Sequence, residues 1–367
     1  MESLFNLFSS RMHSTVHGAC MCFQYMKILK LLFPEAYQDV LALVGLLDPL
    51  EVKGLVLENR IVMPPMHTGL ATSEGAVTDT LVKHYIERSK ALGLLIIEHS
   101  YVSQAGKLSE RQLGIYDDRL VSGLKKLSNS VHAKGTPVVI QINHAGRSAS
   151  REITRMQPVA PSSNGSALEL QVGEIEALAE TFASAALIAI RAGFDGVEVH
   201  GAHGFLLNQF FSPLTNRRQD EYGGSLEKRM RFPLEVVKRT RERIGGSLLL
   251  YRLGSDDLDP AGTQIEDSRK FAVKLKEAGV DVIDVSGGLC GSSPEQLQSI
   301  QGYFISQAQQ IKEVVDIPVI GVGGIRNPEI ADEFIREGKV DLVAVGRELF
   351  RNPDWLAEAA RILRRAR

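Results

Sequence analysis

Short apolar runs alternate along most of the chain with longer stretches whose apolar residues recur at helical spacing. Continuous apolar runs bounded by turn residues are typical of strands that are buried on both faces. The pattern predicts strands at 60–65, 94–100, 137–143, 196–200, 248–253, 281–288, 318–324 and 341–347. It predicts helices at 117–134, 174–192, 226–244, 264–278 and 304–315.

Strands that alternate with helices pair in parallel through right-handed crossovers. Eight such units, beginning near residue 57, are the number that a closed (β/α)8 TIM barrel needs. An open doubly wound α/β sheet would place G-x-G-x-x-G after its first strand, whereas the first run here leads into MPPMHTG. We therefore expect a single α/β barrel domain over 44–367, preceded by an N-terminal extension over 1–43.

Composition narrows the class of protein. The 367 residues are 44% hydrophobic and 23% charged, with a formal net charge of -2. This charge gives no long-range attraction to nucleic acid or to an anionic membrane, and no apolar run reaches the roughly 18 residues that span a bilayer. Cys20, Cys22 and Cys290 lack the spacing of a disulfide framework or a metal site. We expect a cytoplasmic protein without a metal, without nucleic-acid or membrane partners, and with self-association into a homo-oligomer left open.

A barrel has its active site at the C-terminal ends of the strands, and the loops after strands seven and eight form a frequent phosphate site. The seventh run ends in GVGG, which includes Gly323 and Gly324, and the eighth leads into Gly346 and Arg347. Glycines allow close backbone approach, and amide groups at a helix N-terminus bind anions. We interpret these loops as a phosphate site rather than as tight turns alone.

Gln141 and Arg252 end the third and fifth runs, which are otherwise nearly all apolar. A side-chain amide both donates and accepts hydrogen bonds, as recognition of a flat heterocycle requires. An arginine in the barrel mouth needs an anionic partner, because burying it unpaired is costly. A reduced flavin would supply that anion, and a structural salt bridge is the alternative.

His200 and His203 follow the fourth run and lie three positions apart. Metal ligation would require a third ligand, for which the sequence offers no recognisable spacing. Structural histidines with satisfied hydrogen bonds are a second interpretation. The third is a pair of N–H donors that converge on one substrate oxygen and polarise a carbonyl group. We favour the donor pair because it explains why two histidines occur together at the rim.

Four motifs contain or adjoin these residues: LENRIVMPPM, QINHAGR, VEVHGAHGFLLNQFFSPLTNRRQDEYGGSLEKR and VGRELFRNPDW. Together they resemble the Old Yellow Enzyme family of FMN-dependent ene reductases, from about residue 47 to the C-terminus. The resemblance implies that FMN is the cofactor and that NADH or NADPH reduces it. It also implies that the partner is a small α,β-unsaturated carbonyl compound, whose β carbon receives hydride from the flavin.

The resemblance assigns roles to individual positions of this sequence. It implies cofactor contacts for Pro65, Met66, His67, Thr68, His99, Gln141, Arg252, Gly287, Gly323, Gly324, Gly346 and Arg347. It implies that His200 and His203 are catalytic donors to the activating group of the substrate. The remaining substrate contacts that it implies are His67, Phe205 and Tyr303.

Two positions depart from the family pattern. The family usually places a tyrosine two residues after the second donor, as the acid for the α carbon, but that position is Phe205. Water, Tyr101 or His67 would then supply the proton.

His67 itself stands where many relatives have threonine or cysteine, and MHTGL resembles the 2,4-dienoyl-CoA reductase branch. Larger members of that branch add an iron–sulfur segment, but no cysteine follows Cys290, so we expect direct reduction by a nicotinamide.

Two other functions would keep the flavin. One is a dehydrogenase that oxidises an amine or another donor, and the other is a flavin-binding protein with impaired catalysis, which Phe205 would favour.

The segment from His144 to Gly173 is longer than most loops between a strand and a helix. We interpret it as a lid over the substrate pocket or as an inert excursion.

Overall fold

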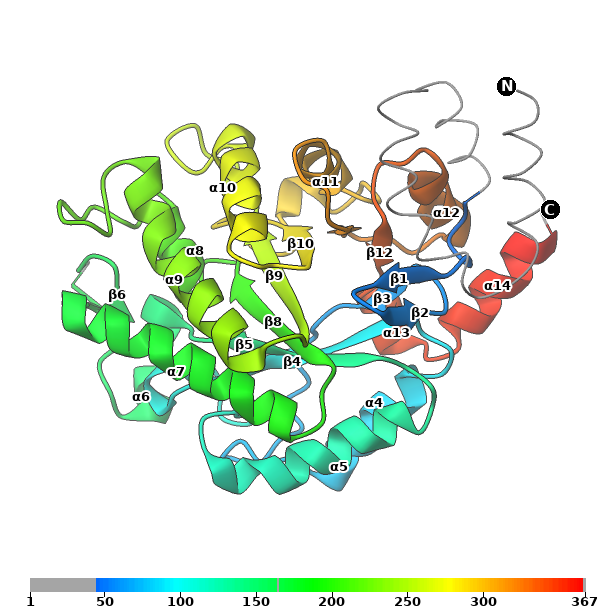
Figure 1. The fold of residues 1–367 in the computed structure, drawn as a ribbon, viewed down its shortest axis with the longest axis horizontal. Helices are drawn as coiled ribbons and strands as arrows, with labels where there is room; N and C mark the ends of the chain where they lie inside the picture. Colours follow the sequence, from blue (N-terminus) through cyan, green and yellow to red (C-terminus); the bar gives the residue numbers. More distant parts are fainter. Residues whose placement is uncertain (1–43, 164, 366–367) are drawn as a thin grey trace.

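In the computed structural model, which describes residues 44–163 and 165–365, eight parallel strands close into a barrel surrounded by helices (Figure 1). The pairing of β12 with β3, with Val343 opposite Ile61, joins the last strand to the first. The predicted TIM barrel and its strands are confirmed, whereas the extension over 1–43 lies outside the described residues. The strands of the barrel are β3 (Ile61–Met63), β4 (Leu94–Tyr101), β5 (Val138–Asn143), β8 (Gly196–Gly201), β9 (Leu248–Gly254), β10 (Val282–Ser286), β11 (Val319–Gly321) and β12 (Leu342–Ala344).

The helices between the strands form an outer ring. The predicted helices correspond to α5 (Val121–His132), α7 (Val172–Arg191), α9 (Leu226–Ile244), α10 (Ile265–Glu277) and α11 (Ile305–Lys312). The structure adds α4 (Asp79–Arg88), α8 (Leu206–Phe211), α12 (Pro328–Arg336), α13 (Arg347–Arg351) and α14 (Trp355–Arg365). Within the described part of the chain, no helix combines the length and the apolar character that a membrane span requires.

Successive residues of each strand face opposite sides of the barrel wall, as the pleat of a strand dictates. In β9, Leu249, Tyr251 and Leu253 belong to the large apolar cluster between the wall and the helices. Leu248 and Leu250 belong to a smaller cluster that fills the barrel interior. Both faces of the strand are therefore buried, which explains why the strands appear in the sequence as nearly continuous apolar runs.

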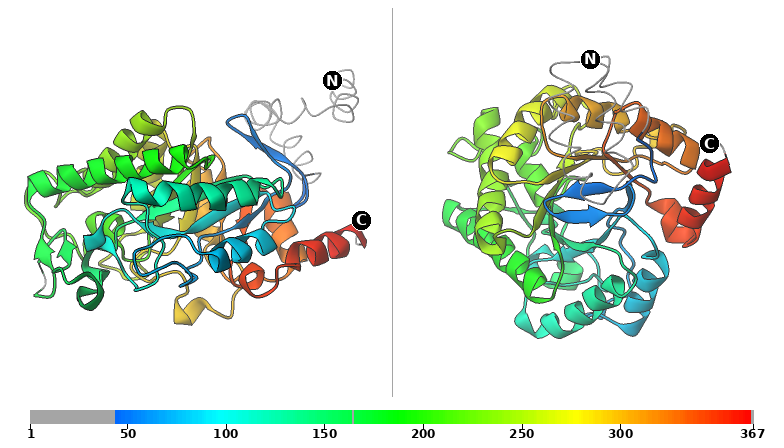
Figure 2. Two further views of the ribbon diagram at one scale, coloured as in Figure 1. Left: turned by 90° about the horizontal axis from the view of Figure 1, so that it is seen from below. Right: turned by 45° about the vertical axis from the view of Figure 1, so that its right-hand side comes forward.

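A two-stranded antiparallel hairpin, β1 (Leu50–Val52) and β2 (Leu55–Leu57), covers the N-terminal end of the barrel. Its side chains Leu50, Val52 and Leu57 pack into the same interior cluster as the first residues of the barrel strands. The right-hand view of Figure 2 shows the hairpin, in blue, across the centre of the ring. The opposite end of the barrel, where the strands end, is the end that carries polar residues.

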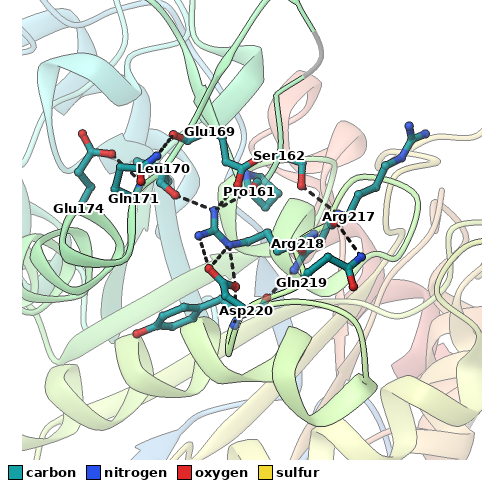
Figure 3. Close-up of polar contacts among 12 residues, drawn as sticks. Pro161, Ser162, Glu169, Leu170, Gln171, Glu174, Arg217, Arg218, Gln219 and Asp220 are labelled. Atoms are coloured by element: carbon teal, nitrogen blue, oxygen red, sulfur yellow. Dashed lines mark hydrogen bonds and ion pairs between the residues drawn. The ribbon is translucent and has the colours of Figure 1, made fainter.

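The long segment after β5 is held in place by one arginine. It contains α6 (Arg151–Thr154) and a two-stranded parallel sheet of β6 (Val159–Ala160) and β7 (Leu168–Glu169). Arg218, which is 6% exposed, donates to the carbonyl oxygens of Pro161 at 2.9 Å and Leu170 at 2.6 Å. Its guanidinium also forms an ion pair with Asp220 (Figure 3). The described residues of the segment are therefore tied to the loop before α9, and its role as a lid or an inert excursion stays a prediction.

Candidate active site

The inward-facing positions near the C-terminal ends of the strands are polar, although the interior beneath them is apolar. Neighbouring strands contribute adjacent members of this layer, since Gln141 lies opposite Glu198 and Arg252 lies opposite Asp284 in the strand register. Buried charges are costly unless they are paired, so such a layer is typical of a binding site rather than of a packing core. The layer consists of Glu98, Gln141, Glu198, Arg252 and Asp284, each at most 5% exposed.

His200 and His203 lie one level above this layer, at the end of β8. Nε2 of His200 is 3.1 Å from Nδ1 of His203, so the two rings converge on one point. Burial, together with the nearby His203 ring, holds the pKa of His200 well below its usual value. Burial, and after it the positive charge of the nearby Arg252, lowers the pKa of His203 well below its usual value. Both rings are therefore neutral at physiological pH, and each has one N–H group to donate.

The proton positions of the pair follow from its other contacts. Nε2 of His203 is 2.8 Å from the Ser286 hydroxyl, and which of the two donates depends on the tautomer of the ring. When Ser286 donates, the His203 proton is on Nδ1 and is directed towards His200. In that case a His200 proton on Nε2 would point at the N–H of His203. A His200 proton on Nδ1 would instead be buried without a hydrogen-bond acceptor. An oxygen acceptor bound between the rings would satisfy both N–H groups, which fits the interpretation as a donor pair.

The backbone of His203 is held in a conformation that residues with side chains rarely adopt. Its φ is 58°, in the left-handed region, which costs free energy for a residue other than glycine. The Gly287 carbonyl accepts a hydrogen bond from the His203 N–H at 3.2 Å. No larger residue fits at Gly287, because a Cβ there would lie 2.1 Å from the Gly291 carbonyl oxygen. The end of β10 therefore fixes both the backbone and the ring of His203.

Below the histidines, two carboxyl groups face each other in the barrel interior. The Gln141 amide nitrogen donates to Oε1 of Glu198 at 2.7 Å. Nη1 of Arg252 lies 3.3 Å from Oδ2 of Asp284. Burial, and then repulsion by Asp284, raises the pKa of Glu198 well above its ordinary value. Burial also raises the pKa of Asp284. The two groups therefore retain a proton between them, and the layer as a whole carries little net charge.

The structural salt bridge expected as an alternative for Arg252 is thus present, but it does not satisfy the guanidinium. The Nε of Arg252 is buried and has no hydrogen-bond acceptor. Leaving a buried donor unpaired costs about 1–3 kcal/mol, more for a charged group. An anionic ligand in the barrel mouth would offset that cost, so the residues present fit a flavin whose reduced form is anionic at its pyrimidine end.

His67 follows β3 and lies at the edge of the mouth, with 35% of its side chain exposed. Its Nδ1 is 3.0 Å from the fully buried carboxylate of Glu98, and its Nε2 is 3.0 Å from the Ser109 hydroxyl. The other oxygen of Glu98 accepts from the Thr68 hydroxyl at 2.5 Å. One carboxylate from β4 therefore orients both His67 and Thr68.

His99, the next residue of β4, stacks on His67 with 5.2 Å between ring centroids. The Gln112 amide oxygen accepts from the Leu108 N–H at 2.7 Å, which fixes the amide nitrogen as the donor to Nδ1 of His99 at 2.8 Å. The His99 proton is therefore on Nε2. Burial, with the nearby His67 ring, lowers the pKa of His99 to about 3, so the ring stays neutral.

The glycines after β11 form the turn that the sequence predicted as a phosphate site. Gly323 and Gly324 have φ values of 127° and 63°, which only glycine adopts without strain. A Cβ on Gly324 would lie 3.0 Å from Nη2 of Arg347, so the arginine lies directly against this turn. Gly346, which precedes Arg347, packs against the segment after β3. A Cβ on Gly346 would lie 3.1 Å from the sulfur of Met66.

Phe205 and Tyr303 lie in different parts of the mouth. The Phe205 ring is 4.9 Å from the His200 ring and 5.8 Å from the His99 ring, so it borders the histidine pair. The Tyr303 hydroxyl donates to the Ser292 carbonyl at 2.8 Å, and its ring lies against Gly324. The structure therefore places Tyr303 with the glycine turn, and its role as a substrate contact stays a prediction.

The site also contains residues to which no role was assigned from the sequence, among them Glu98, Ser109, Gln112 and Asp284. Glu98 and Asp284 have a detectable signal, because each is a charged residue inside an otherwise apolar run, as in LLIIEHS and DVIDVSGG. Ser109 and Gln112 have none, since they lie in an ordinary polar loop. Among the described residues, no group of three or more histidine, cysteine, aspartate or glutamate side chains could hold a metal ion.

Comparison with known proteins agrees with this geometry. The model of the NADH:flavin oxidoreductase / NADH oxidase family matches residues 45–365. An NADH oxidase of Thermoanaerobacter brockii is 44% identical over 321 residues, which are 84% of this chain and 49% of that protein. An NADPH dehydrogenase of Geobacillus sp. (strain WCH70) is 39% identical over 323 residues, covering 87% of this chain and 94% of that protein. The chain thus spans about half the length of the first relative and nearly all of the second.

Among solved structures, an old yellow enzyme homologue from Zymomonas mobilis superposes with a TM-score of 0.76 at 27% identity. The superposition covers 88% of this chain and 94% of that protein.

Proposed function

Because the chain belongs to the NADH:flavin oxidoreductase / NADH oxidase family, whose cofactor is FMN, we propose that it is an FMN-dependent oxidoreductase that reduces activated C=C bonds. The substrate class is an α,β-unsaturated carbonyl compound, and NADH or NADPH is the electron donor. Bound FMN would accept hydride from the nicotinamide and supply it to the β carbon of the substrate. The names NADH oxidase, NADPH dehydrogenase and old yellow enzyme homologue, borne by similar proteins, support the assignment.

The residues that would hold the cofactor come from both halves of the barrel. Gly323, Gly324 and Arg347 offer backbone amides and a cation for the phosphate, at the loops where this fold most often binds one. Gln141 and Arg252 would contact the pyrimidine edge of the flavin ring. The segment 65–68 and His99 would border the ring, as the resemblance implies.

The observation that carries the proposal is the convergence of His200 and His203, with 3.1 Å between their nitrogens. Two N–H donors on one carbonyl oxygen stabilise the negative charge that develops there when hydride adds to the β carbon. Neutral imidazoles donate without placing an unpaired charge in a buried site. A hydrogen bond donated by Ser286 to Nε2 of His203 would keep the His203 proton on Nδ1, beside His200.

The first experiment is to purify the protein and identify its cofactor. We expect a yellow protein that releases FMN on denaturation, is bleached anaerobically by NADH or NADPH, and is reoxidised by cyclohexenone or a dienoyl thioester. Bleaching without reoxidation by any alkene would favour a dehydrogenase of another donor or an impaired flavoprotein. A colourless protein that cannot be reconstituted with FMN would contradict the proposal.

The second experiment replaces both His200 and His203 with alanine. Because the pair holds the carbonyl oxygen, we expect weaker binding of phenolic ligands and loss of alkene reduction. His132→Ala is the control, since it removes a hydrogen-bonded histidine, paired with Asp195 at 2.8 Å, at the opposite end of the barrel. Unchanged ligand binding in the double variant would remove the donor role.

Two expectations about the whole protein remain part of the proposal. The few cysteines support a cytoplasmic location, and cell fractionation tests it. Self-association into a homo-oligomer is tested by light scattering on the purified protein.

A further inference from the structure

The proposed reduction requires a proton at the α carbon, and the position expected to supply it cannot do so. Phe205, two residues after His203, has a hydrocarbon ring beside His200 and His99. Tyr101 does not replace it, because its hydroxyl is already donated to the Glu74 carbonyl at 2.9 Å. Burial raises the pKa of Tyr101 well above its ordinary value, which makes it a weaker acid still.

The neutral histidines of the mouth are also poor acids. Burial lowers the pKa of His99 to about 3, and it lowers the pKa values of His200 and His203 well below the usual range. These rings can donate hydrogen bonds, but a neutral imidazole does not give up its remaining proton near neutral pH. His99 and His200 are also buried away from solvent, which would have to return the proton after each turnover.

His67 has the contacts that an acid in this place needs. Its Nδ1 faces the buried Glu98 carboxylate at 3.0 Å, which holds the ring and balances a charge on it. Its Nε2 faces the Ser109 hydroxyl at 3.0 Å, and 35% of its side chain is exposed, so solvent reaches it. The ring stacks on His99, which in turn contacts Phe205, so His67 belongs to the same row of rings that borders the histidine pair.

We propose that His67 is the general acid that protonates the α carbon, oriented by Glu98 and reprotonated from solvent through Ser109. The inference rests on the proposed function. After hydride reaches the β carbon, the former C=C electron pair is delocalised onto the carbonyl oxygen held by His200 and His203. That pair then forms the new C–H bond at the α carbon while the N–H bond at Nε2 of the His67 imidazolium, whose Nδ1 faces Glu98, breaks and leaves a neutral ring. The bonding electrons stay on the imidazole nitrogen, and the carbonyl group is restored.

The test separates the two half-reactions of the FMN-loaded protein by anaerobic rapid mixing, first with NADPH and then with cyclohexenone. His67→Gln keeps polar contacts to Glu98 and Ser109 but cannot transfer a proton. General-acid help is worth about 10²–10⁴-fold, and water replaces part of it. We therefore expect the rate constant for reoxidation by the alkene to fall at least about tenfold relative to that for reduction by NADPH.

A second variant separates proton delivery from a structural role. Phe205→Tyr introduces a phenol where the family has one, so the double variant His67→Gln, Phe205→Tyr should recover at least half of the lost reoxidation rate. His132→Gln serves as the control, because it alters a half-exposed histidine–carboxylate pair far from the mouth. An unchanged ratio in His67→Gln, or a loss that the tyrosine does not restore, would overturn the assignment. Absence of any alkene reduction by the unmodified protein would instead contradict the proposed function itself.

Discussion

At the scale of single residues, the candidate site depends on where protons lie. Ser286 and Gln112 each lie 2.8 Å from a ring nitrogen of a site histidine, and the Gln112 amide fixes the tautomer of His99. What matters for the histidine is the atom that such a partner presents to the ring, because it decides which nitrogen carries the proton. Without Ser286, Nε2 of His203 would lose its hydrogen-bond partner.

Replacing Ser286 with alanine should weaken binding of a phenolic ligand by about tenfold or more. The reason is that Nε2 of His203 loses its hydrogen-bond donor, so the proton no longer prefers Nδ1, and an oriented bond is worth about 1–3 kcal/mol. Titration of the flavin absorbance with the phenol gives the dissociation constant, and nitrogen chemical shifts of His203 report the tautomer.

Ser128→Ala is the control for that variant, since Ser128 is also fully buried and its hydroxyl donates to the Ala192 carbonyl at 2.6 Å outside the barrel. If Ser286→Ala binds the phenol as tightly as the unmodified protein, the tautomer is set by some other group.

The sequence predicts such details unevenly. His200, His203, Gln141 and Arg252 could be identified because polar residues at the ends of apolar runs are conspicuous, and the barrel topology brings those ends together. The contacts of Ser109 and Gln112 could not, because a pairing between residues 42 or 13 positions apart in the chain depends on side-chain packing that no local pattern encodes.

At the scale of elements, buried parallel strands explain why the secondary structure was predictable. Their apolar runs contrast sharply with the flanking turns, and α9 begins and ends where the sequence pattern placed it, at Leu226–Ile244. The segment between β5 and α7 lacks such a contrast. Its course is set by Arg218, which joins Pro161 and Leu170 to Asp220 and which local patterns do not reveal.

Arg218→Lys should therefore destabilise the protein by about 3 kcal/mol or more, although the charge is kept. Lysine cannot reproduce the fork that reaches two carbonyl oxygens and a carboxylate at once, and each lost hydrogen bond to a charged group costs about 1.5–3 kcal/mol. Chemical denaturation measures the loss, and limited proteolysis should show faster cleavage within 151–171.

The neighbouring residue provides the comparison for this variant. Arg217 is exposed, and its side chain extends away from the cluster in Figure 3, so Arg217→Lys should leave both measurements unchanged. Equal effects of the two substitutions would mean that the buried arginine does not hold the segment.

At the scale of the whole molecule, the barrel combines an apolar floor with a charged interior layer. Burial raises the pKa values of Glu198 and Asp284, so the folded protein retains a proton that the unfolded chain releases. A carboxyl group with a raised pKa in the folded state lowers stability as pH rises from its unfolded pKa through its folded pKa. Each pKa unit of difference costs about 1.4 kcal/mol above that window.

Glu198→Gln should therefore be more stable than the unmodified protein at pH 8 and nearly equal to it at pH 4. Glutamine keeps the acceptor for Gln141 and places an amide donor beside Asp284, without a proton to lose. Thermal unfolding at a series of pH values tests this, and Glu277→Gln, on the surface next to Lys274, is the control. A variant that loses stability most at high pH would show that the carboxylate is ionised and favourable there.

The hairpin of β1 and β2 has a consequence for how reactants travel. Leu50, Val52 and Leu57 fill the N-terminal end of the barrel interior, so reactants would enter from the C-terminal end of the strands. The electron donor and the acceptor would both need the reactive face of the same cofactor. They would then have to enter the same end of the barrel one after the other. Under the proposed function, an excess of either reactant would therefore slow turnover by occupying the cofactor face that the other one needs.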